Sequence, residues 1–360
     1  TTSEQEVIIK GRSKKNRPVN ERSLVSARAF TVEETQRYAA AVNDPLRMAT
    51  AYAGVVGADD GNNAIVIRGN APNGLLWRME GIDIPNPNHF AGTNSSAGGI
   101  SILSSALLAN SDFVTGAWAA EYGNALSGAF DLKLRKGNNQ KHEYNLQAGM
   151  LGLNAAAEGP LKLGKQRGSY LVNYRYSTLA LLGKLGLDIG LGNTDFQDLS
   201  YHIHLPAGKA GSFTLFGFAG LSSQRGDAEK DSSKWDNEGD RYGLRFDGTT
   251  AFTGATHQIR LSPSTLLKSG IGYSYVKSAF HETYINDELE EDIDFKTSNT
   301  EQKLTFTSTL LQRFGKRHSL KTGVIVNIPQ YNLQQYNRDN RQSPLELVIR
   351  QTGNTQLLQA

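Results

Sequence analysis

The chain of 360 residues contains no cysteine and no long apolar run. The absence of cysteine excludes disulfide bonds and thiolate metal sites, although it leaves the cellular compartment open. A membrane-spanning helix needs roughly 18 consecutive apolar residues. The best candidate, Thr178–Gly192, is shorter and is interrupted by Lys184 and Asp188. A helical membrane protein is therefore excluded. Because the sequence at Thr1 does not read as a signal peptide, we expect a chain that is mature, trimmed or cytosolic.

The chain also lacks a large excess of either charge, with a formal net charge of +3. Such a small excess does not indicate a nucleic-acid partner. No Ser-His-Asp order, phosphate loop or metalloprotease motif is present, so we expect no enzyme activity, no catalytic residue, no metal site and no cofactor. One basic cluster is interpreted as a solvated arm, and it consists of Lys10, Arg12, Lys14, Lys15, Arg17 and Arg22.

Residues 26–138 mix helical and strand patterns, and we expect them to form a compact α/β domain behind an arm of residues 1–25. The spacing of Thr31 and Glu34 is a capping-box signature, which predicts a helix over residues 31–43. The other expected elements are a helix from Pro45 to Gly54, a short helix leading into a strand within Ser101–Gly116, and strands at Ala64–Ile67, Gly81–Ile84 and residues 127–137.

After Gly137 the helical periodicity nearly vanishes, and apolar residues alternate with polar ones. This alternation is typical of strands that are half-buried. Residues 139–360 are expected to supply about ten such strands. Their connections alternate in length, with short turns near residues 160–168, 206–211, 262–265 and 315–318, and long polar loops near 178–196, 222–240, 286–300 and 330–344.

Antiparallel strands with short turns at one end and long loops at the other are typical of a transmembrane β-barrel. A soluble β-sandwich or propeller is the alternative, but its loops would not sort by length. A barrel with a plugged lumen has about 22 strands. We therefore expect this sequence to be incomplete, or further chain to close the wall.

Several motifs give the pattern a family resemblance. "NNAIVIRGNAPNGLLWRMEGIDIPNP" and "EYGNALSGAFDLKLRKG" resemble the plug domain of a TonB-dependent outer-membrane receptor of the Bacteroidetes-type branch. "GPLKLGKQRGSYLVNYRYS" and "DFQDLSYHIHL" resemble the first barrel hairpins of the same branch. The resemblance implies a mainly β fold, with an N-terminal α/β plug inside a partial antiparallel barrel. It also implies residence in the outer membrane of a Gram-negative bacterium and import of a glycan, peptide or metal chelate.

The resemblance further suggests residues that lock the plug to the barrel. Arg68 and Gly69 match the family's "IRG" strand, whose arginine pairs with barrel carboxylates. A second lock arginine is replaced here by Thr115–Gly116, so Glu121 and Arg135 are the candidate substitutes. The alternative for Arg68 is an ordinary surface salt bridge.

The plug tip faces outward in this family and is expected to bind substrate. The candidate binding residues offer aromatic surface for stacking and directional donors for polar groups. In the alternative interpretation, "PNPNHF" is only a tight loop that proline and asparagine fix. The candidates are Trp77, Arg78, Asn86, Asn88, His89 and Phe90.

"SEQEVIIKG" near the N-terminus resembles the TonB box, the extended segment that the periplasmic protein TonB grips. Its β-branched centre favours an extended backbone that can add as a strand to a partner's sheet. The alternative is a strand belonging to an upstream domain. The residues concerned are Glu6, Val7, Ile8, Ile9 and Lys10. Outer-membrane lipid and a surface lipoprotein are the other expected partners, and a non-transporting assembly subunit with the plug as a gasket is the alternative function.

Overall fold

The structure is a computed structural model. It describes residues 18–20, 22–23, 25–30, 45–59, 63–92, 98–104, 107–116, 118–149, 152–164, 166–178, 193–315, 317–340 and 342–360. The helix expected over residues 31–43 lies outside the described residues. Within the described ranges, none of the helices has both the length and the apolar character to cross a membrane.

The described residues between 18 and 137 form a small mixed unit, which we name the plug. Its main sheet has the strand order β1-β8-β9-β4-β5, with β4 and β9 parallel at its centre. All residues of β4 and β9 are buried, which explains their nearly continuous apolar sequence. The plug elements are β1 (Ala27–Phe30), α2 (Pro45–Ala49), β2 (Val55–Asp59), β3 (Ala64–Ile67), η2 (Pro72–Gly74), β4 (Leu75–Met79), β5 (Ile82–Asp83), β6 (Asn88–His89), β7 (Ile100–Ser101), β8 (Ser111–Val114) and β9 (Gly128–Leu132).

Aromatic rings fill the centre of the plug. Phe130 of β9 stacks on Trp77 of β4 with ring centroids 4.5 Å apart, and it contacts Phe113 of β8 at the same distance. Phe30 meets Phe130 edge-on at 6.0 Å. These contacts join four neighbouring strands, so the aromatic cluster stabilises the sheet as one body.

The helical content of the plug is lower than the sequence predicts. Helix α2 ends at Ala49 and is followed by turns, although Gly54 was the expected stop. The described part of residues 102–110 forms bends, a turn and an isolated bridge between Leu108 and Leu134 instead of a helix. Pairing with a neighbouring strand here overrides a local helical preference that was weak.

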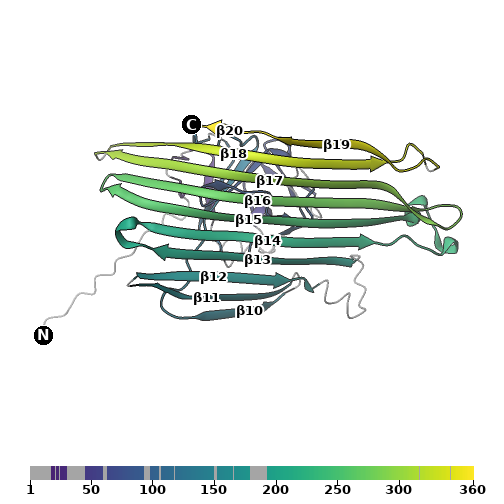
Figure 1. Ribbon diagram of the computed structural model, residues 1–360, viewed down its shortest axis with the longest axis horizontal. Coiled ribbons are helices and arrows are strands. Elements are labelled where there is room, and N and C mark those ends of the chain that lie inside the picture. Colours follow the sequence, from purple (N-terminus) through teal and green to yellow (C-terminus); the bar gives the residue numbers. More distant parts are fainter. Residues whose placement is uncertain are drawn as a thin grey trace.

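The rest of the chain forms an eleven-stranded antiparallel sheet, which we name the wall (Figure 1). This architecture confirms the expected mainly β fold. Its strands are β10 (Glu143–Ala148), β11 (Leu153–Leu163), β12 (Gln166–Tyr176), β13 (Asn193–Pro206), β14 (Ser212–Gly226), β15 (Tyr242–Ser262), β16 (Thr265–Ile285), β17 (Glu291–Phe314), β18 (His318–Asn337), β19 (Glu346–Asn354) and β20 (Leu357–Gln359). Short 3-10 turns η3 (Gly208–Ala210), η4 (Ser232–Lys234) and η5 (Glu238–Arg241) lie in the connections.

Strands β17 and β18 are longer than the sequence pattern indicates. Strand β17 has 24 residues, whereas about 9–11 tilted residues cross a bilayer. Ladder pairing continues through residues 291–300 and 330–337, which were expected to be loops. Polar residues on both faces hide a strand from a periodicity search, so only the pairing reveals these extensions.

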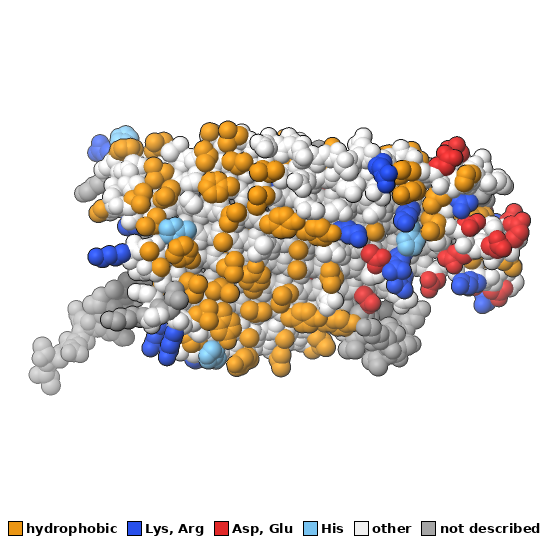
Figure 2. Space-filling view, viewed as in Figure 1, with side chains coloured by type: hydrophobic (Ala, Val, Ile, Leu, Met, Phe, Trp, Pro, Cys, Tyr) orange, Lys and Arg blue, Asp and Glu red, His pale blue; other side chains and the backbone are white. Residues whose placement is uncertain are grey.

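The two faces of the wall differ in chemistry. Side chains of Phe196, Asp198, Phe216 and Phe252 are buried against the plug. The residues at the alternate positions of the strands point to the other face, and many of them are apolar and exposed. These apolar groups gather over the middle and one end of the strands, while charged groups gather at the other end (Figure 2). The exposed apolar residues include Leu199, Leu215, Leu221, Ile271, Tyr273, Leu304, Phe306 and Val324. An apolar outer belt with charged residues beyond it is what a bilayer selects.

The plug lies against the concave side of the wall and touches several of its strands (Figure 1). Glycine allows the closest approach: a Cβ added at Gly272 of β16 would lie 2.8 Å from Ile82 Cγ2 of the plug. A Cβ at Gly220 of β14 would lie 2.8 Å from the ring of His89. The lack of side chains at these positions therefore determines how deeply the plug sits.

Candidate functional site

Four of the expected binding residues come together at the tip of the plug, around strand β6. Asn88 donates from its side-chain amide to Asn86 Oδ1 at 2.6 Å. Asn88 and His89 are buried, whereas Asn86 and Phe90 are half-buried. Phe90 adopts a positive φ of 60°, which turns the chain directly after β6. Asn86 and Phe90 are thus the tip residues that retain exposed surface.

His89 fixes the tip to the wall through a buried charged cluster. Its Nε2 lies 3.1 Å from Asp198 Oδ2 of β13. Arg175 of β12 donates to the same oxygen from Nε at 2.8 Å and from its terminal amine at 2.6 Å, and also to the carbonyl of Ser101 in the plug. Burial removes water from the imidazolium and lowers the pKa of His89; Asp198 opposes this shift, and the charge of Arg175 adds to it. The neutral ring can donate from Nε2, so the contact is a hydrogen bond.

Aromatic rings from both parts of the molecule surround the tip. Phe90 of the plug faces Phe196 of β13 at 6.4 Å and Phe246 of β15 at 6.1 Å between ring centroids. Beyond them, Phe280 of β16 and Phe295 of β17 lie 6.1 Å apart. Cross-strand pairing of Phe246 with Phe280 places both on the concave face. Apart from buried Phe196, these rings are half-buried, so they form an aromatic lining above the plug.

The sequence did not identify this lining. Phe246, Phe280 and Phe295 lie on three strands separated by long stretches of chain, and only the register brings them to one height. Tyr242 and Tyr284 continue the same face with rings 5.0 Å apart. Arg241 stacks on Tyr284 at 4.5 Å and on Trp235 at 4.7 Å. Aromatic residues at every second strand position would have been the only available signal.

The expectation that Trp77 and Arg78 lie on an exposed tip is wrong, because both are buried in the plug. Trp77 belongs to the aromatic core through Phe130. Arg78 donates from Nε to Asp83 Oδ1 at 2.8 Å and from a terminal amine to the Glu121 carbonyl at 2.7 Å. Desolvation lowers the pKa of Arg78, but the carboxylates of Asp83 and Asp131 outweigh it and hold that pKa above its ordinary value. Arg78 is thus a structural cation.

Arg68 does not pair with a wall carboxylate in the described part of the chain. Its side chain is exposed and donates to Ser26 Oγ at 3.0 Å within the plug. Arg68 and Gly69 both have positive φ, 51° and 81°, in the turn that follows β3. The turn directs the side chain along the plug surface, away from the described wall, and the Arg68 lock stays a prediction.

Glu121 and Arg135 both contact the wall. Glu121 Oε2 lies 2.5 Å from the ammonium group of Lys321 on β18. Arg135 donates to both carboxylate oxygens of Glu158 on β11, at 2.8 and 2.9 Å. Strands β11 and β18 lie near opposite edges of the described wall. These two ion pairs therefore tie the plug to the wall on both sides.

A third ion pair joins the plug to the wall and was not foreseen. Glu80, which has a φ of 51°, accepts from Lys268 of β16 at 3.3 Å. Its other carboxylate oxygen accepts from the backbone of Leu134 at 2.9 Å. Burial raises the pKa of Glu80, but the ammonium groups of Lys268 and Lys133 more than compensate and hold that pKa below its ordinary value. Glu80 is therefore ionised at neutral pH.

The TonB-box-like residues Glu6, Val7, Ile8, Ile9 and Lys10 lie outside the described residues. Within the described residues, no group of three or more His, Asp or Glu side chains is arranged to hold a metal ion. The plug–wall interface instead combines hydrogen bonds, ion pairs and aromatic contacts. This arrangement can hold the plug against the wall and release it. It can also present aromatic and amide groups to a ligand.

No protein-family model and no curated protein sequence matches the chain. Solved structures do match it. The ferripyoverdine receptor of the outer membrane of Pseudomonas aeruginosa matches with a TM-score of 0.57 and 13% identity, over 85% of this chain and 44% of that one. The outer membrane transporter YddB from Escherichia coli matches with a TM-score of 0.59 and 11% identity, over 92% and 53%.

The siderophore receptor PiuA from Acinetobacter baumannii gives a TM-score of 0.58 and 13% identity, over 94% of this chain and 50% of that one. The chain therefore spans about half the length of the structures it matches. At these identities the likeness concerns the fold, which agrees with the plug and wall described above. The chain has the fold of the plug and part of the barrel of an outer-membrane receptor.

Proposed function

We propose that this chain is the plug and first part of the barrel of a TonB-dependent transporter in the outer membrane of a Gram-negative bacterium. The observation that carries the proposal is the position of the plug on the concave side of a wall whose other face is apolar. A soluble sheet would expose polar groups on that outer face. The residues 1–25, 26–138 and 139–360 would serve as arm, plug and barrel segment.

The ion pairs between plug and wall at partly exposed positions support gating, because each of them is individually modest. The pairs Glu121–Lys321 and Glu80–Lys268 join partly exposed side chains, and such pairs contribute about 1 kcal/mol or less each. Arg135–Glu158 is bidentate but also partly exposed. TonB would grip the arm at Glu6–Lys10 by strand addition and pull, which would break these contacts in turn. The plug would then leave a path along the concave face of the wall.

The substrate would bind above the plug, between its tip and the aromatic lining of Phe246, Phe280 and Phe295. Rings stack on sugar faces, on aromatic chelators and on peptide side chains, while Asn86 supplies directional hydrogen bonds. A glycan, a peptide or a metal chelate fits this chemistry. Metal chelates are the first class to test, because two of the similar structures are a ferripyoverdine receptor and a siderophore receptor.

The proposal is tested by uptake of ligand in cells that express the full-length gene. Deleting Glu6–Lys10 should abolish energy-dependent uptake while surface binding of the same ligand remains. A matched deletion of five residues in the basic part of the arm, residues 12–16, should leave uptake intact. If the Glu6–Lys10 deletion does not change uptake, the importer mechanism is refuted. A protein that neither binds nor imports ligand, and whose loss impairs a surface assembly, would instead be a gasket subunit.

The ligand itself is best identified by mass spectrometry of molecules that remain bound to the purified full-length protein. Variants Phe280→Ala and Asn86→Ala should lose the retained molecule, because both face the proposed site. Tyr273→Ala, on the opposite face of β16, serves as the matched control. Co-purification of a lipoprotein would test the proposed surface partner, and a Bacteroidetes-type origin would favour such a partner.

A further inference from the structure

A hollow of about 420 Å³ lies between the plug and strands β16 to β19 of the wall, and we name it the inner hollow. Pro85, which directly precedes Asn86 of the tip, lines it from the plug side. Its volume lies within the range of about 300–1,000 Å³ that is usual for small-molecule sites. The wall residues that line it include Ser274, Glu301, Lys303, Pro329, Tyr331 and Gln351.

Strand register places the polar groups of the inner hollow on the plug-facing side of the wall. Gly272 of β16 approaches Ile82 of the plug, and Ser274 stands two residues further along the same strand. Side chains two residues apart on a strand share a face. Ser274 is directly opposite Lys303 of β17, and directly opposite residues also share a face. Glu301, two residues before Lys303, therefore faces the plug as well.

The two charged groups of the inner hollow lack a bonded partner in the described part of the chain. Both Lys303 and Glu301 are half-buried, yet neither charged group is within ion-pair or hydrogen-bond distance of another described side chain. Asp83 of the plug is near enough to attract Lys303, but its carboxylate is already bonded to Arg78 at 2.8 Å. A partly desolvated charge without a partner is unfavourable. A ligand that supplies both opposite charges would therefore be stabilised here.

The spacing of the two charges indicates the kind of ligand. Residues two apart on a strand have Cα atoms about 7 Å apart. Lys303 and Glu301 are therefore neighbours, but their charged groups do not come within the roughly 4 Å of an ion pair. A molecule with a carboxylate and an ammonium group a few bonds apart can lie between them, with its carboxylate at Lys303 and its ammonium at Glu301. The hydroxyl of Ser274, opposite Lys303, can add a hydrogen bond to that carboxylate.

Apolar surfaces border the inner hollow beside these charges. Pro85 lines it from the plug, and Pro329 lines it from β18, directly opposite Lys303. The side chain of Tyr331 lies over Gly353 of β19, where an added Cβ would be 2.5 Å from the Tyr331 hydroxyl oxygen. Glycine at this position thus leaves room for the ring along the side of the hollow next to β19. Together these surfaces suit the aliphatic parts of a small ligand.

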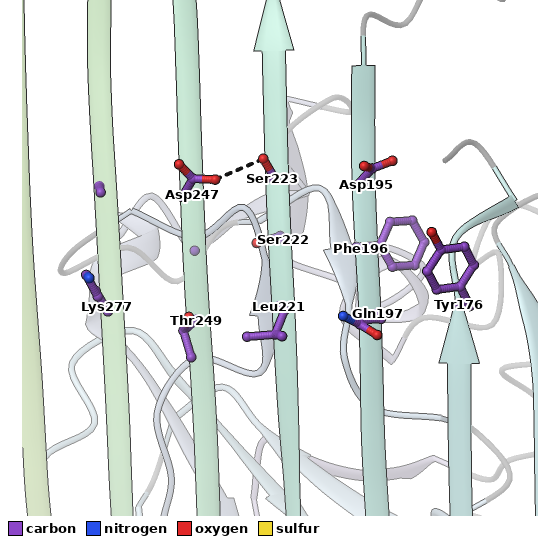
Figure 3. Close-up of a pocket in the computed structure, with 12 residues that line it drawn as sticks. Tyr176, Asp195, Phe196, Gln197, Leu221, Ser222, Ser223, Asp247, Thr249 and Lys277 are labelled. Atoms are coloured by element: carbon purple, nitrogen blue, oxygen red, sulfur yellow. Dashed lines mark hydrogen bonds between the residues drawn. The ribbon is translucent and has the colours of Figure 1, made fainter. Parts of the chain in front are cut away.

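A hollow on the outer face of the wall provides a contrast. It measures about 520 Å³, and exposed Leu221 and Lys277 are among the residues that line it (Figure 3). Its carboxylate Asp247 accepts a hydrogen bond from Ser223 at 2.9 Å, and its other carboxylate, Asp195, is exposed. The charges of this outer hollow are therefore either bonded within the chain or open to the surroundings. Unlike those of the inner hollow, they do not call for a ligand.

We propose that the inner hollow binds the zwitterionic groups of a free amino acid or dipeptide. The carboxylate of the ligand lies at Lys303 and Ser274, its ammonium group lies at Glu301, and its apolar parts lie against Pro85 and Tyr331. The inference rests on the proposed function, because it takes the plug-facing side of the wall as the lumen that the substrate enters. It adds a charged subsite to the aromatic lining, and this subsite selects ligands that carry both charges.

The test is equilibrium dialysis of radiolabelled alanyl-leucine against the full-length protein purified in detergent. This assay requires neither a membrane nor energy coupling, so its failure is distinguishable from a failure of uptake. Two capped probes each lack one charge: N-acetyl-alanyl-leucine has no ammonium group, and alanyl-leucine amide has no carboxylate. The test variants are Lys303→Met and Glu301→Gln. The matched controls are Lys277→Met and Glu288→Gln, at exposed positions outside the inner hollow.

Wild type and controls should bind the free dipeptide, and either cap should weaken binding about tenfold or more, because each cap removes one charge-assisted contact. Lys303→Met should bind the free dipeptide and its amide with equal affinity, and Glu301→Gln should do the same for the free and acetylated dipeptides. Two results would overturn the proposal: wild type binds none of the probes, or a variant remains as sensitive to its matching cap as wild type. Should Lys303→Met fail to fold, Lys303→Gln provides the same comparison.

Discussion

Substitution of the two arginines of the plug gives a sharp test of the structure. Arg78 is buried and compensates Asp83, whereas Arg68 is exposed and donates one hydrogen bond to Ser26. In Arg78→Met, Asp83 remains buried without its cation, and loss of one partner of a buried ion pair costs about 3–5 kcal/mol. In Arg68→Met, the loss is that of a surface contact, about 0.5 kcal/mol or less. The family pattern alone predicts the reverse order.

The measurement uses the absence of cysteine from the chain. Ala129→Cys places one thiol in a fully buried position of β9, where a maleimide reacts only after the plug opens. The free energy of unfolding falls by about 1–3 kcal/mol for each molar of urea. A loss of about 4 kcal/mol in that free energy therefore lowers the urea concentration at half-labelling by about 1–4 M. Arg68→Met should shift this midpoint by less than about 0.5 M. Equal shifts for the two variants would refute the assignment of Arg78 as the structural cation.

Three further predictions use the same labelling assay on the plug–wall interface. Because burial lowers the pKa of His89 relative to about 6.5 in an unfolded chain, the neutral ring stabilises the interface above that pH, and stability should fall as the pH drops below 6.5. His89→Gln should remove this acid-dependent loss, and an unchanged pH profile would contradict the assignment. A double-mutant cycle of Glu121→Gln with Lys321→Gln should give a coupling of about 1 kcal/mol, and additive effects would show that the pair does not bind the plug. Gly220→Val should lower the midpoint by the equivalent of about 1–3 kcal/mol, because the new side chain overlaps Ile102 and His89, and an unchanged midpoint would contradict the close packing.

The fold could be predicted from the sequence where one physical signal dominated. Alternation of apolar and polar residues indicated the wall strands, and the buried run Ala64–Ile67 coincides with β3. The helix after Pro45 was predicted too long, because its local signals are weak beside the strand pairing that surrounds it. The extensions of β17 and β18 were predicted as loops, since polar side chains occupy both faces of these segments. Periodicity carries no information where both faces are polar.

The candidate site was predictable only in part, because burial is a property of the assembled chain. "WRMEGIDIPNPNHF" contains half-buried and core residues at close spacing, and sequence alone gave them one role. Trp77 and Arg78 belong to the central strand β4, so they cannot reach the surface on which Phe90 lies. The partners of Glu80 and His89 are Lys268 and Asp198, which are more than one hundred residues away. Such pairs follow from strand register, which a single sequence does not specify.

The distribution of buried charge separates the forces that hold the plug together from those that hold it in place. Within the plug, Arg78 and Asp83 are 2% and 4% exposed, and breaking such a pair is costly. Between plug and wall, Glu121 and Lys321 are 18% and 27% exposed, and such pairs exchange easily with water. A force on the plug should therefore break these exposed pairs before it unfolds the plug's own core, which leaves the buried contact of His89 with Asp198 as the strongest polar contact between plug and wall. The plug can then move as an intact body, and return as one, which is what a reusable gate requires.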